Sequence, residues 1–515
     1  MKPHLFCSAL FTTLLALLSV SAAAAAGSRR PNVLLAIADD QSFPLTSFAG
    51  YKAVNTPAFD RVAREGVYFK NGFAGSPGCS PSRAALLTGR HDWQIEEAGT
   101  HASSFPKRYI VFPDILEQAG YRVGLSGKGW GPGNWKISER PRNPAGNEAD
   151  GHTLTPPARG ISNKDYAANF KGFLARRAKD QPFYFWYGGH EPHRGYEKGS
   201  GLRSGKKLED AVPPPFLPDS PEVRSDILDA CLEIEWFDRH LGLMIKALEE
   251  AGELENTLII VTADNGMPFP RAKANAYEHG IHVPLAIRWG AKVPGGRQIE
   301  DVVGFVDLTA TILEATGTKH PNPSLPPSGR SIMNILTSRQ QGLVDATRVA
   351  YSSRERHSSA RFDNWTYPQR ALRKSQYLYI RNFRPDRWPA GDPVVLKDDG
   401  TPESPHSGYK DIDGGPTLDF LIAKADDPKL GRFLQLAVAK RPVEELFDIK
   451  ADPGCLKNLA ADPKHAAAKA KLAQQLETTL RQTGDRRVLD GGDIWETYPR
   501  YSPIRKFPKP VLNRE

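Results

Sequence analysis

The first residue with a setting suited to chemistry is Cys79, within the stretch SPGCSPSRAALLTGR. Glycine, proline and serine surround this cysteine, a helical segment follows it, and Arg83 lies four residues later. A cysteine that only forms a disulfide does not need such surroundings. The mature chain also has an odd number of cysteines, so at least one of them has another task. The setting indicates that this one is Cys79.

Two further groups of polar residues follow apolar runs that read as buried strands. Asp39 and Asp40 end the run NVLLAIADD, and Asp264 and Asn265 end the run NTLIIVTADN. In open α/β sheets, ligands bind beyond the carboxyl ends of the strands. Carboxylate and amide oxygens suit Ca²⁺, with Mg²⁺ as the second choice. Each pair alone could simply cap a helix or turn, but together with Cys79 they favour a metal site.

The first part of the chain alternates between strand and helix patterns. This alternation predicts an α/β fold with a large, doubly wound, mainly parallel sheet flanked by helices. The expected strands are 32–40, 121–129, 182–189, 256–266 and 283–290, and the expected helices are 56–66, 82–89, 112–120, 165–178, 222–251 and 307–317.

The pattern changes after residue 335. Segments 348–354, 370–383 and 443–453 read as strands of a smaller antiparallel sheet, and segment 464–485 reads as a helix packed on it. We therefore expect a large α/β domain over residues 27–335 and a smaller C-terminal α+β domain over residues 336–515.

Residues 1–26 have the features of a secretory signal peptide. A single positive charge precedes an apolar run from Leu5 to Val20, and small residues follow. The alternative is a membrane anchor, for which this run is short, and no later segment is apolar enough to span a bilayer. The protein is therefore expected to be exported, either periplasmic or secreted. Removing this segment takes away Lys2 and changes the net charge from +9 to +8. Such a charge favours polyanions such as nucleic acid, anionic lipid or sulfated polysaccharide.

The two other cysteines of the mature chain lie in ordinary settings. Cys231 belongs to an apolar stripe with spacings of three and four residues, which predicts a buried position on a helix. Cys455 follows the turn ADPG and could pair or stay free.

The stretch CSPSR followed by AALLTG resembles the signature of the formylglycine-dependent sulfatases of the alkaline phosphatase superfamily. The resemblance implies that a formylglycine-generating maturation enzyme converts Cys79 to formylglycine (3-oxoalanine), whose hydrated aldehyde supplies the nucleophile. A metal lowers the pKa of one hydroxyl of such a hydrate. Arg83 could hold the second hydroxyl, and the expected helix start at Ser82 favours an anion.

The same resemblance implies roles for other residues. Asp39, Asp40, Asp264 and Asn265 match the metal ligands of that family, with the modified Cys79 as a further ligand.

Three more residues match positions outside the metal site. Lys128 and Lys273 match two cationic sulfate contacts, and His193 matches a histidine near the leaving-group oxygen that could be a general acid. Alone, each would more simply be a surface residue, but their order along the chain favours the functional interpretation.

One position departs from the family pattern. Many sulfatases have a histidine two residues after the equivalent of Lys128, where this chain has Trp130. That histidine is thought to assist regeneration of the aldehyde, and a tryptophan cannot accept a proton. His190 is a candidate to replace it, or else it only shapes the substrate pocket.

Within the family, the chain is most similar to the heparan N-sulfatases, through CSPSRAALLTG, EPHRG, TADNGMPFPRAKANAY and ELFDIKADPGCLKNLAADP. The resemblance implies a sulfated glycan substrate, with N-sulfoglucosamine first and an O-sulfated polysaccharide as the alternative. Arg271, Lys273, Asn275 and Tyr277 would lie at the pocket rim, or else order that loop. Exo action is favoured over endo action because the fold tends to form pockets.

Two other classes stay open. Phosphonate and phosphodiester hydrolases of the same superfamily share the metal site, and an inactive glycan-binding protein would keep Cys79 as a thiol. No nucleic-acid-binding motif is found, and export also argues against that partner.

Overall fold

The computed structural model describes residues 29–397 and 399–502. The predicted signal peptide lies outside the described residues. Within them, every helix is too short or too polar to cross a bilayer.

A seven-stranded sheet forms the centre of the larger part of the molecule, in the order β3-β4-β1-β5-β6-β2-β7. Strand β6 runs antiparallel to both of its neighbours, and the other pairings are parallel. The strands are β1 (Asn32–Ala38), β2 (Val67–Phe73), β3 (Arg122–Gly127), β4 (Phe183–Gly188), β5 (Thr257–Ala263), β6 (His282–Arg288) and β7 (Arg297–Gly304). Every residue of β1, β4, β5 and β6 is buried, as expected for strands covered on both faces.

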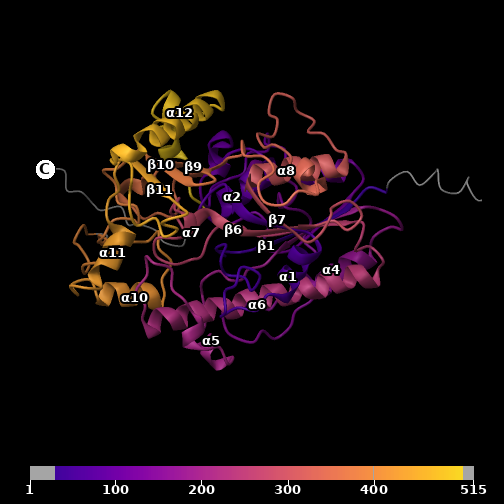
Figure 1. Cartoon of the computed structure of the whole chain (residues 1–515), viewed down its shortest axis with the longest axis horizontal. Coiled ribbons are helices and arrows are strands. Elements are labelled where there is room, and N and C mark those ends of the chain that lie inside the picture. The colour runs from indigo at the N-terminus through magenta and orange to yellow at the C-terminus, as the bar shows by residue number, and fades with distance from the viewer. Residues whose placement is uncertain (1–28, 398, 503–515) are drawn as a thin grey trace, which may run out of the picture.

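Helices cover both faces of this sheet, so the predicted doubly wound architecture is confirmed (Figure 1). In one layer, helix α2 (Cys79–Thr88) packs against both α3 (Phe112–Gln118) and α8 (Phe305–Thr316). Helices α1 (Pro57–Glu65), α4 (Tyr166–Ala175) and α6 (Pro221–Glu250) form the other layer. The shorter helices of this part are α5 (Ser200–Arg203), α7 (Glu278–Ile281) and α9 (Met333–Thr337).

The longest helix, α6, shows why its sequence folds as it does. Its first residue is Pro221, and the side chain of Ser220 accepts a hydrogen bond from the backbone N–H of Val223. Such a cap stabilises a helix by about 1 kcal/mol. The predicted apolar stripe is buried, and it includes Cys231, which is a free thiol.

The C-terminal part contains the predicted smaller antiparallel sheet, which has four strands in the order β11-β10-β9-β8 because the predicted segment 370–383 forms two paired strands. Its strands are β8 (Ala350–Arg354), β9 (Gln369–Lys374), β10 (Tyr377–Asn382) and β11 (Glu444–Asp448). Helix α12 (Ala466–Gln482) lies over it, and buries Leu472, Leu476 and Leu480 against the sheet. The other helices are α10 (Pro416–Ala423), α11 (Gly431–Val438), α13 (Arg486–Leu489) and α14 (Ile494–Thr497).

Two strands of the large sheet were not predicted from the sequence. In β2, Lys70 and Asn71 interrupt the apolar run at a point where the register with both neighbours shifts. Strand β7 lies at the edge of the sheet, and its first residues alternate between buried and exposed positions. Both patterns are therefore weaker than those of the central strands.

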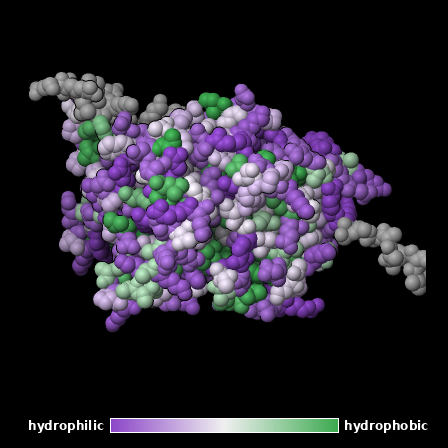
Figure 2. Space-filling view, turned by 90° about the horizontal axis from the view of Figure 1, so that it is seen from above, coloured by the Kyte–Doolittle hydropathy of each residue, from purple (hydrophilic) through white to green (hydrophobic). Residues whose placement is uncertain are grey.

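The face shown in Figure 2 is mainly hydrophilic, with apolar residues scattered over it. Such single apolar residues are normal on a protein surface.

Candidate active site

The ends of two adjacent strands bring the predicted acids together. Strands β1 and β5 are parallel neighbours, with Ala38 opposite Ala263, so the residues that follow them meet at one edge. The backbone N–H of Asp40 donates to Oδ1 of Asp264 at 3.0 Å. Nδ2 of Asn265 donates to Oδ1 of Asp40 at 2.7 Å. All these side chains are buried.

Helix α2 brings Cys79 and Arg83 to the same place. The helix begins at Cys79, three residues earlier than expected, and it ends at Gly89, whose left-handed φ of 66° suits glycine. Arg83 is fully buried, and its Nε donates to Oδ2 of Asp264 at 2.7 Å. One Nη lies 3.6 Å from Oδ1 of Asp39, so the guanidinium lies between two acids.

Two lysines reach the same acids from different loops. Nζ of Lys128, after β3, lies 2.5 Å from Oδ2 of Asp39. Nζ of Lys273, after β5, lies 2.6 Å from Oδ2 of Asp40. Cys79 therefore lies near a network of ion pairs in which three cations contact three carboxylates: Arg83, Lys128 and Lys273 with Asp39, Asp40 and Asp264.

The charges change the acidity of Cys79. Burial raises the pKa of its thiol, but Lys128 and Lys273 outweigh this effect and lower the pKa to about 7. Burial likewise raises the pKa of Asp39, yet Lys128, His193 and Arg83 hold it well below its usual value. At Asp264 burial has the larger effect and raises the pKa well above its usual value, although Arg83 opposes it. The cations therefore stabilise negative charge at Cys79 and Asp39 but not at Asp264.

His193 lies where the centre is open to solvent, since 38% of its side chain is exposed. Its Nδ1 lies 3.0 Å from the carbonyl oxygen of Arg194, and its Nε2 lies 3.8 Å from Oδ2 of Asp40. Burial and Lys273 lower the pKa of His193, but Asp40, Asp39 and a contact with Cys79 more than offset them, so the pKa is raised. A protonated imidazole here can donate a proton.

His190 is half-buried, near enough to Asp39, Lys128 and Arg83 to interact electrostatically. Burial lowers its pKa to about 4, which keeps the imidazole neutral at pH 7. Its role as a replacement for the missing histidine stays a prediction.

At the position where many sulfatases have a histidine, Trp130 packs in the protein interior. Trp130 is buried, its ring lies edge-on to Phe105 with centroids 5.1 Å apart, and its Nε1 donates to the carbonyl oxygen of Ser80 at 3.0 Å. Trp130 therefore supports the first turn of α2, beside Cys79.

The donor atoms fit a hard divalent cation. Ligand atoms of Asp39, Cys79 and Asp264 all lie within 4.8 Å of one another. Oδ1 of Asp39 and Oδ1 of Asn265 are buried without a hydrogen bond from the described residues. Buried acceptors of this kind are costly unless something satisfies them, and a cation would do so.

Two residues of this centre were not predicted from the sequence. Nε2 of His101 lies 4.0 Å from Sγ of Cys79. Oδ2 of Asp413, from the C-terminal part, lies 3.1 Å from Nζ of Lys273. Neither residue has a motif around it that would have identified it.

None of the four residues expected at a pocket rim lies at one: Arg271, Lys273, Asn275 and Tyr277 are all buried. This favours the alternative, that these residues order the loop. Arg271 donates to the carbonyl oxygens of Leu436 and Cys455, and the hydroxyl of Tyr277 donates to Glu445 at 2.7 Å. Arg271 and Tyr277 thus hold the loop against the C-terminal part, and Nδ2 of Asn275 donates to the carbonyl oxygen of Lys273 within the loop at 3.0 Å.

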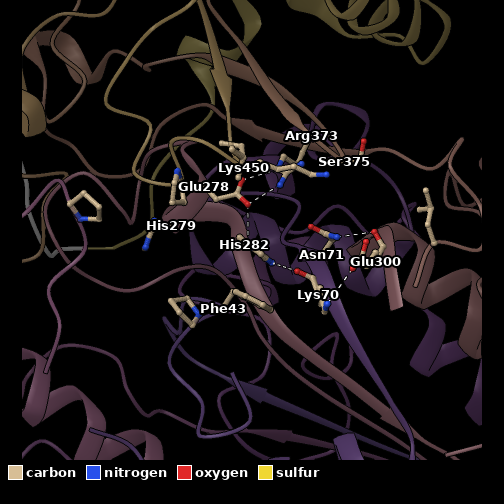
Figure 3. A pocket seen from close by; sticks show the side chains of 15 residues that line it. Phe43, Lys70, Asn71, Glu278, His279, His282, Glu300, Arg373, Ser375 and Lys450 are labelled. Carbon is tan, nitrogen blue, oxygen red and sulfur yellow. Dashed lines mark hydrogen bonds and ion pairs between the residues drawn. The ribbon is translucent and has the colours of Figure 1, made fainter. Parts of the chain in front are cut away.

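A separate cavity of about 670 Å³ lies between the two sheets and contains none of the predicted site residues (Figure 3). Glu278 pairs with His282 and with Arg373, and Lys70 pairs with Glu300. Of these pairs, the one between Glu278 and Arg373 joins the two parts, and the other two lie within the larger part.

Comparisons with known proteins agree with the geometry. The chain is 29% identical over 501 residues to the human N-sulphoglucosamine sulphohydrolase, covering 89% of this chain and 91% of that protein. It is 26% identical over 529 residues to an ulvan-active sulfatase of Formosa agariphila, covering 94% of this chain and 81% of the relative.

Among solved structures, one determined with its substrate D-glucosamine-2-N,6-O-disulfate matches with a TM-score of 0.61 at 18% identity, over 88% of this chain and 98% of the other. A 2-O GAG sulfatase matches with a TM-score of 0.59 at 18% identity, over 93% of this chain and 99% of the other. At this identity they show the shared fold. The family description "Sulfatase" matches residues 31–318, more than half of the chain. The chain therefore belongs to the sulfatase family and is a sulfuric ester or sulfamate hydrolase.

Proposed function

We propose that this protein removes sulfate groups from a sulfated glycan through a formylglycine formed from Cys79, with N-sulfoglucosamine as the leading substrate. The observation that carries the proposal is the position of Cys79, which is buried at the first turn of α2 among cations and acids. The similarity to the human N-sulphoglucosamine sulphohydrolase supports the choice of substrate.

Asp39, Asp40, Asp264 and Asn265 would hold the divalent cation, Ca²⁺ or else Mg²⁺, together with the modified residue 79. When bound, the cation lowers the pKa of a hydroxyl of the hydrated aldehyde and offsets charge on the sulfate. The hydrated form has two hydroxyls, one to attack sulfur and one to release sulfate afterwards. An ordinary serine lacks this second route.

The remaining residues would act on the substrate or on the hydrated residue 79. Lys128 and Lys273 would contact the sulfate oxygens, and Arg83 would hold the second hydroxyl of the hydrate. His193 would give its proton to the leaving atom, because it is the imidazole on the solvent side and its pKa is raised. His190 stays a candidate for assisting regeneration of the aldehyde.

Several further assignments belong to the proposal. A maturation enzyme converts Cys79, the segment 1–26 directs export to the periplasm or the outside of the cell, and residues 27–335 and 336–515 form two domains. The similarity to an ulvan-active sulfatase keeps an O-sulfated polysaccharide as the second candidate substrate.

The test is mass spectrometry of the peptide that contains Cys79, from protein isolated from its native host. Conversion to the aldehyde lowers the mass by about 18 Da. The same preparation is then assayed with N-sulfoglucosamine, 4-nitrophenyl sulfate and an aryl phosphodiester. If Cys79 is found as an unmodified thiol, the proposed catalysis fails and the inactive glycan-binding protein is the remaining alternative. Faster turnover of the phosphodiester than of the sulfates would indicate a phosphodiesterase.

A further inference from the structure

A carboxylate from the C-terminal part reaches the proposed leaving-group side of the active site. Oδ2 of Asp413 lies 3.1 Å from Nζ of Lys273. A carboxylate oxygen of Asp413, one of Asp40 and a ring nitrogen of His193 all lie within 4.8 Å of one another. The side chain of Asp413 is 2% exposed, whereas that of His193 is 38% exposed, so Asp413 forms an inner wall beside the opening.

The loop that carries Asp413 is held firmly on its N-terminal side. Two residues earlier, the carboxylate of Asp411 accepts hydrogen bonds from Arg354 at 2.6 Å and from Arg361 at 2.7 Å. The backbone N–H and the hydroxyl of Ser358 donate to its other oxygen. All four residues are buried. This loop therefore has little freedom to move Asp413 away.

The C-terminal side of the loop is tied to the neighbour of His193. Arg194 forms a two-bond ion pair with Asp226, with both distances 2.7 Å. Thr417 donates its hydroxyl to the same carboxylate at 2.5 Å. A Cβ at Gly415 would lie 2.5 Å from an Nη of Arg194, so the loop passes directly over this guanidinium. His193 and Asp413 are thus held in a fixed relation.

These contacts argue against a second metal at this place. The ammonium of Lys273 already lies 2.6 Å from Asp40 and 3.1 Å from Asp413, between the two carboxylates. It supplies the positive charge that a cation would bring. Asp413 is instead placed to meet the part of the substrate that departs near His193.

Resting on the proposed function, we infer that Asp413 determines specificity by selecting substrates whose sulfate group is carried by nitrogen rather than by oxygen. A sulfamate nitrogen bears a hydrogen that a carboxylate can accept. An ester oxygen at the same place bears none, and its growing negative charge would be repelled by Asp413.

The chemistry of the step supports this choice. His193 gives its proton to the bridging nitrogen, the S–N bond breaks with its electron pair staying on nitrogen, and the sulfuryl group passes to the nucleophilic oxygen at residue 79. The amine leaves neutral and takes a further proton from water. Overall, R–NH–SO₃⁻ and water give R–NH₃⁺ and SO₄²⁻. The bridging nitrogen carries positive charge once His193 has protonated it and before the S–N bond breaks, next to the carboxylate of Asp413, so the interaction is stronger in this state than in the bound substrate.

The test compares two sugars that differ only in the bridging atom at C2, N-sulfoglucosamine and D-glucose 2-sulfate. Both are assayed with the formylglycine-containing wild-type protein and with Asp413→Asn, which keeps the side-chain size and removes the charge. We expect the wild type to prefer the sulfamate. In the variant, kcat/KM for the sulfamate should fall at least tenfold further than kcat/KM for 4-nitrophenyl sulfate. Asp419→Asn, the same change at an exposed position of α10, is the matched control and should leave both values unchanged.

Equal losses on all substrates would overturn the inference, because they would mean that Asp413 only positions Lys273. A wild-type protein that hydrolyses sulfate esters but not the sulfamate would also overturn it, while sulfatase activity stands. Failure of every substrate would instead refute the proposed function. If Asp413→Asn does not fold, product inhibition of the wild-type protein is measured instead to test the inference. Glucosamine should inhibit 4-nitrophenyl sulfate hydrolysis at least tenfold more strongly than glucose, and equal inhibition would contradict a role for the carboxylate.

Discussion

Nδ2 of Asn265 donates a hydrogen bond to Oδ1 of Asp40 at 2.7 Å, while the amide oxygen of Asn265 is buried without a donor from the described residues. This hydrogen bond satisfies the NH₂ group of Asn265 but leaves its carbonyl oxygen without a donor. An unsatisfied buried acceptor destabilises a protein by about 1–3 kcal/mol. A bound cation would remove this cost, so stability and metal binding should be linked at Asn265.

Calcium should therefore raise the thermal unfolding midpoint of the wild type, and Asn265→Ala should abolish most of the increase. A ligand at 100 times its Kd stabilises the folded state by about 2.7 kcal/mol. Calorimetry with calcium, with magnesium and with chelator measures the effect. The control is Asn256→Ala, just before the opposite end of β5, which should respond like the wild type. An undiminished calcium response in Asn265→Ala would exclude Asn265 as a ligand.

Protein in which Cys79 has not been converted should react selectively with iodoacetamide. The pKa of Cys79 is lowered to about 7, as its two neighbouring lysines outweigh burial, whereas burial raises the pKa of Cys231 to about 12. Burial also raises the pKa of Cys455. The lowered pKa favours the thiolate of Cys79 near neutral pH, and the thiolate is the reactive form. Peptide mass spectrometry after brief labelling should find the adduct on residue 79. Comparable labelling of Cys231 in folded protein would contradict this.

Asp411 should contribute to stability at neutral pH and lose this contribution in acid. Burial raises the pKa of Asp411, but Arg361 and Arg354 outweigh it and lower the pKa from 3.8 to about 2. A carboxyl with a lowered pKa stabilises the fold above its unfolded pKa, and the contribution disappears as pH falls towards the folded pKa. The shift corresponds to about 2 kcal/mol.

Urea unfolding of the wild type and Asp411→Asn should accordingly differ most at pH 6–7, and the difference should shrink between about pH 4 and about pH 2. Asp419→Asn should follow the wild type over the whole range, since its side chain is exposed. A constant difference between wild type and Asp411→Asn would show that the ion pair does not cause it.

Trp130 should be needed for packing around α2. Removing a large buried aromatic side chain costs about 3–5 kcal/mol, and losing a hydrogen bond to a buried carbonyl costs about 1–3 kcal/mol. Trp130→Ala should therefore be strongly destabilised, while Trp130→Phe should lose mainly the bond to Ser80. Chemical denaturation measures both, and Trp365→Phe, at an exposed position, is the control. Equal stability of Trp130→Ala and wild type would contradict the structural role.

The residues that the sequence predicted well are those that follow a simple physical pattern. Asp39 and Asp264 end long apolar runs, and parallel strands bring such ends together, so their meeting could be foreseen. Cys79 and Arg83 share one helix, so their spacing determines their contact. The helix nevertheless starts at Cys79 and not at Ser82, because the extended conformation of Gly78 serves as its N-cap.

Other contacts depend on long-range folding and could not be predicted. Asp413 meets Lys273 although the two residues lie far apart in the sequence, and nothing in the sequence around Asp413 differs from an ordinary turn. Arg271 and Tyr277 looked like rim residues because they adjoin Lys273, yet partners from the C-terminal part bury them. Strand β2 was not predicted because Lys70 and Asn71, at its register shift, interrupt its apolar pattern.

The anchored loop from Asp411 to Thr417 has a consequence for how such an enzyme could change over time. The metal-ligand candidates and the nucleophile lie within residues 31–318, the region that matches the sulfatase family, but Asp413 lies outside it. Its two anchors, Arg354 with Arg361 and Asp226 with Arg194, do not involve Asp413 itself. Residue 413 can therefore be exchanged while both anchors of the loop stay in place. A change at this one loop position would remove a partner of Lys273 and could retune which bond is cut.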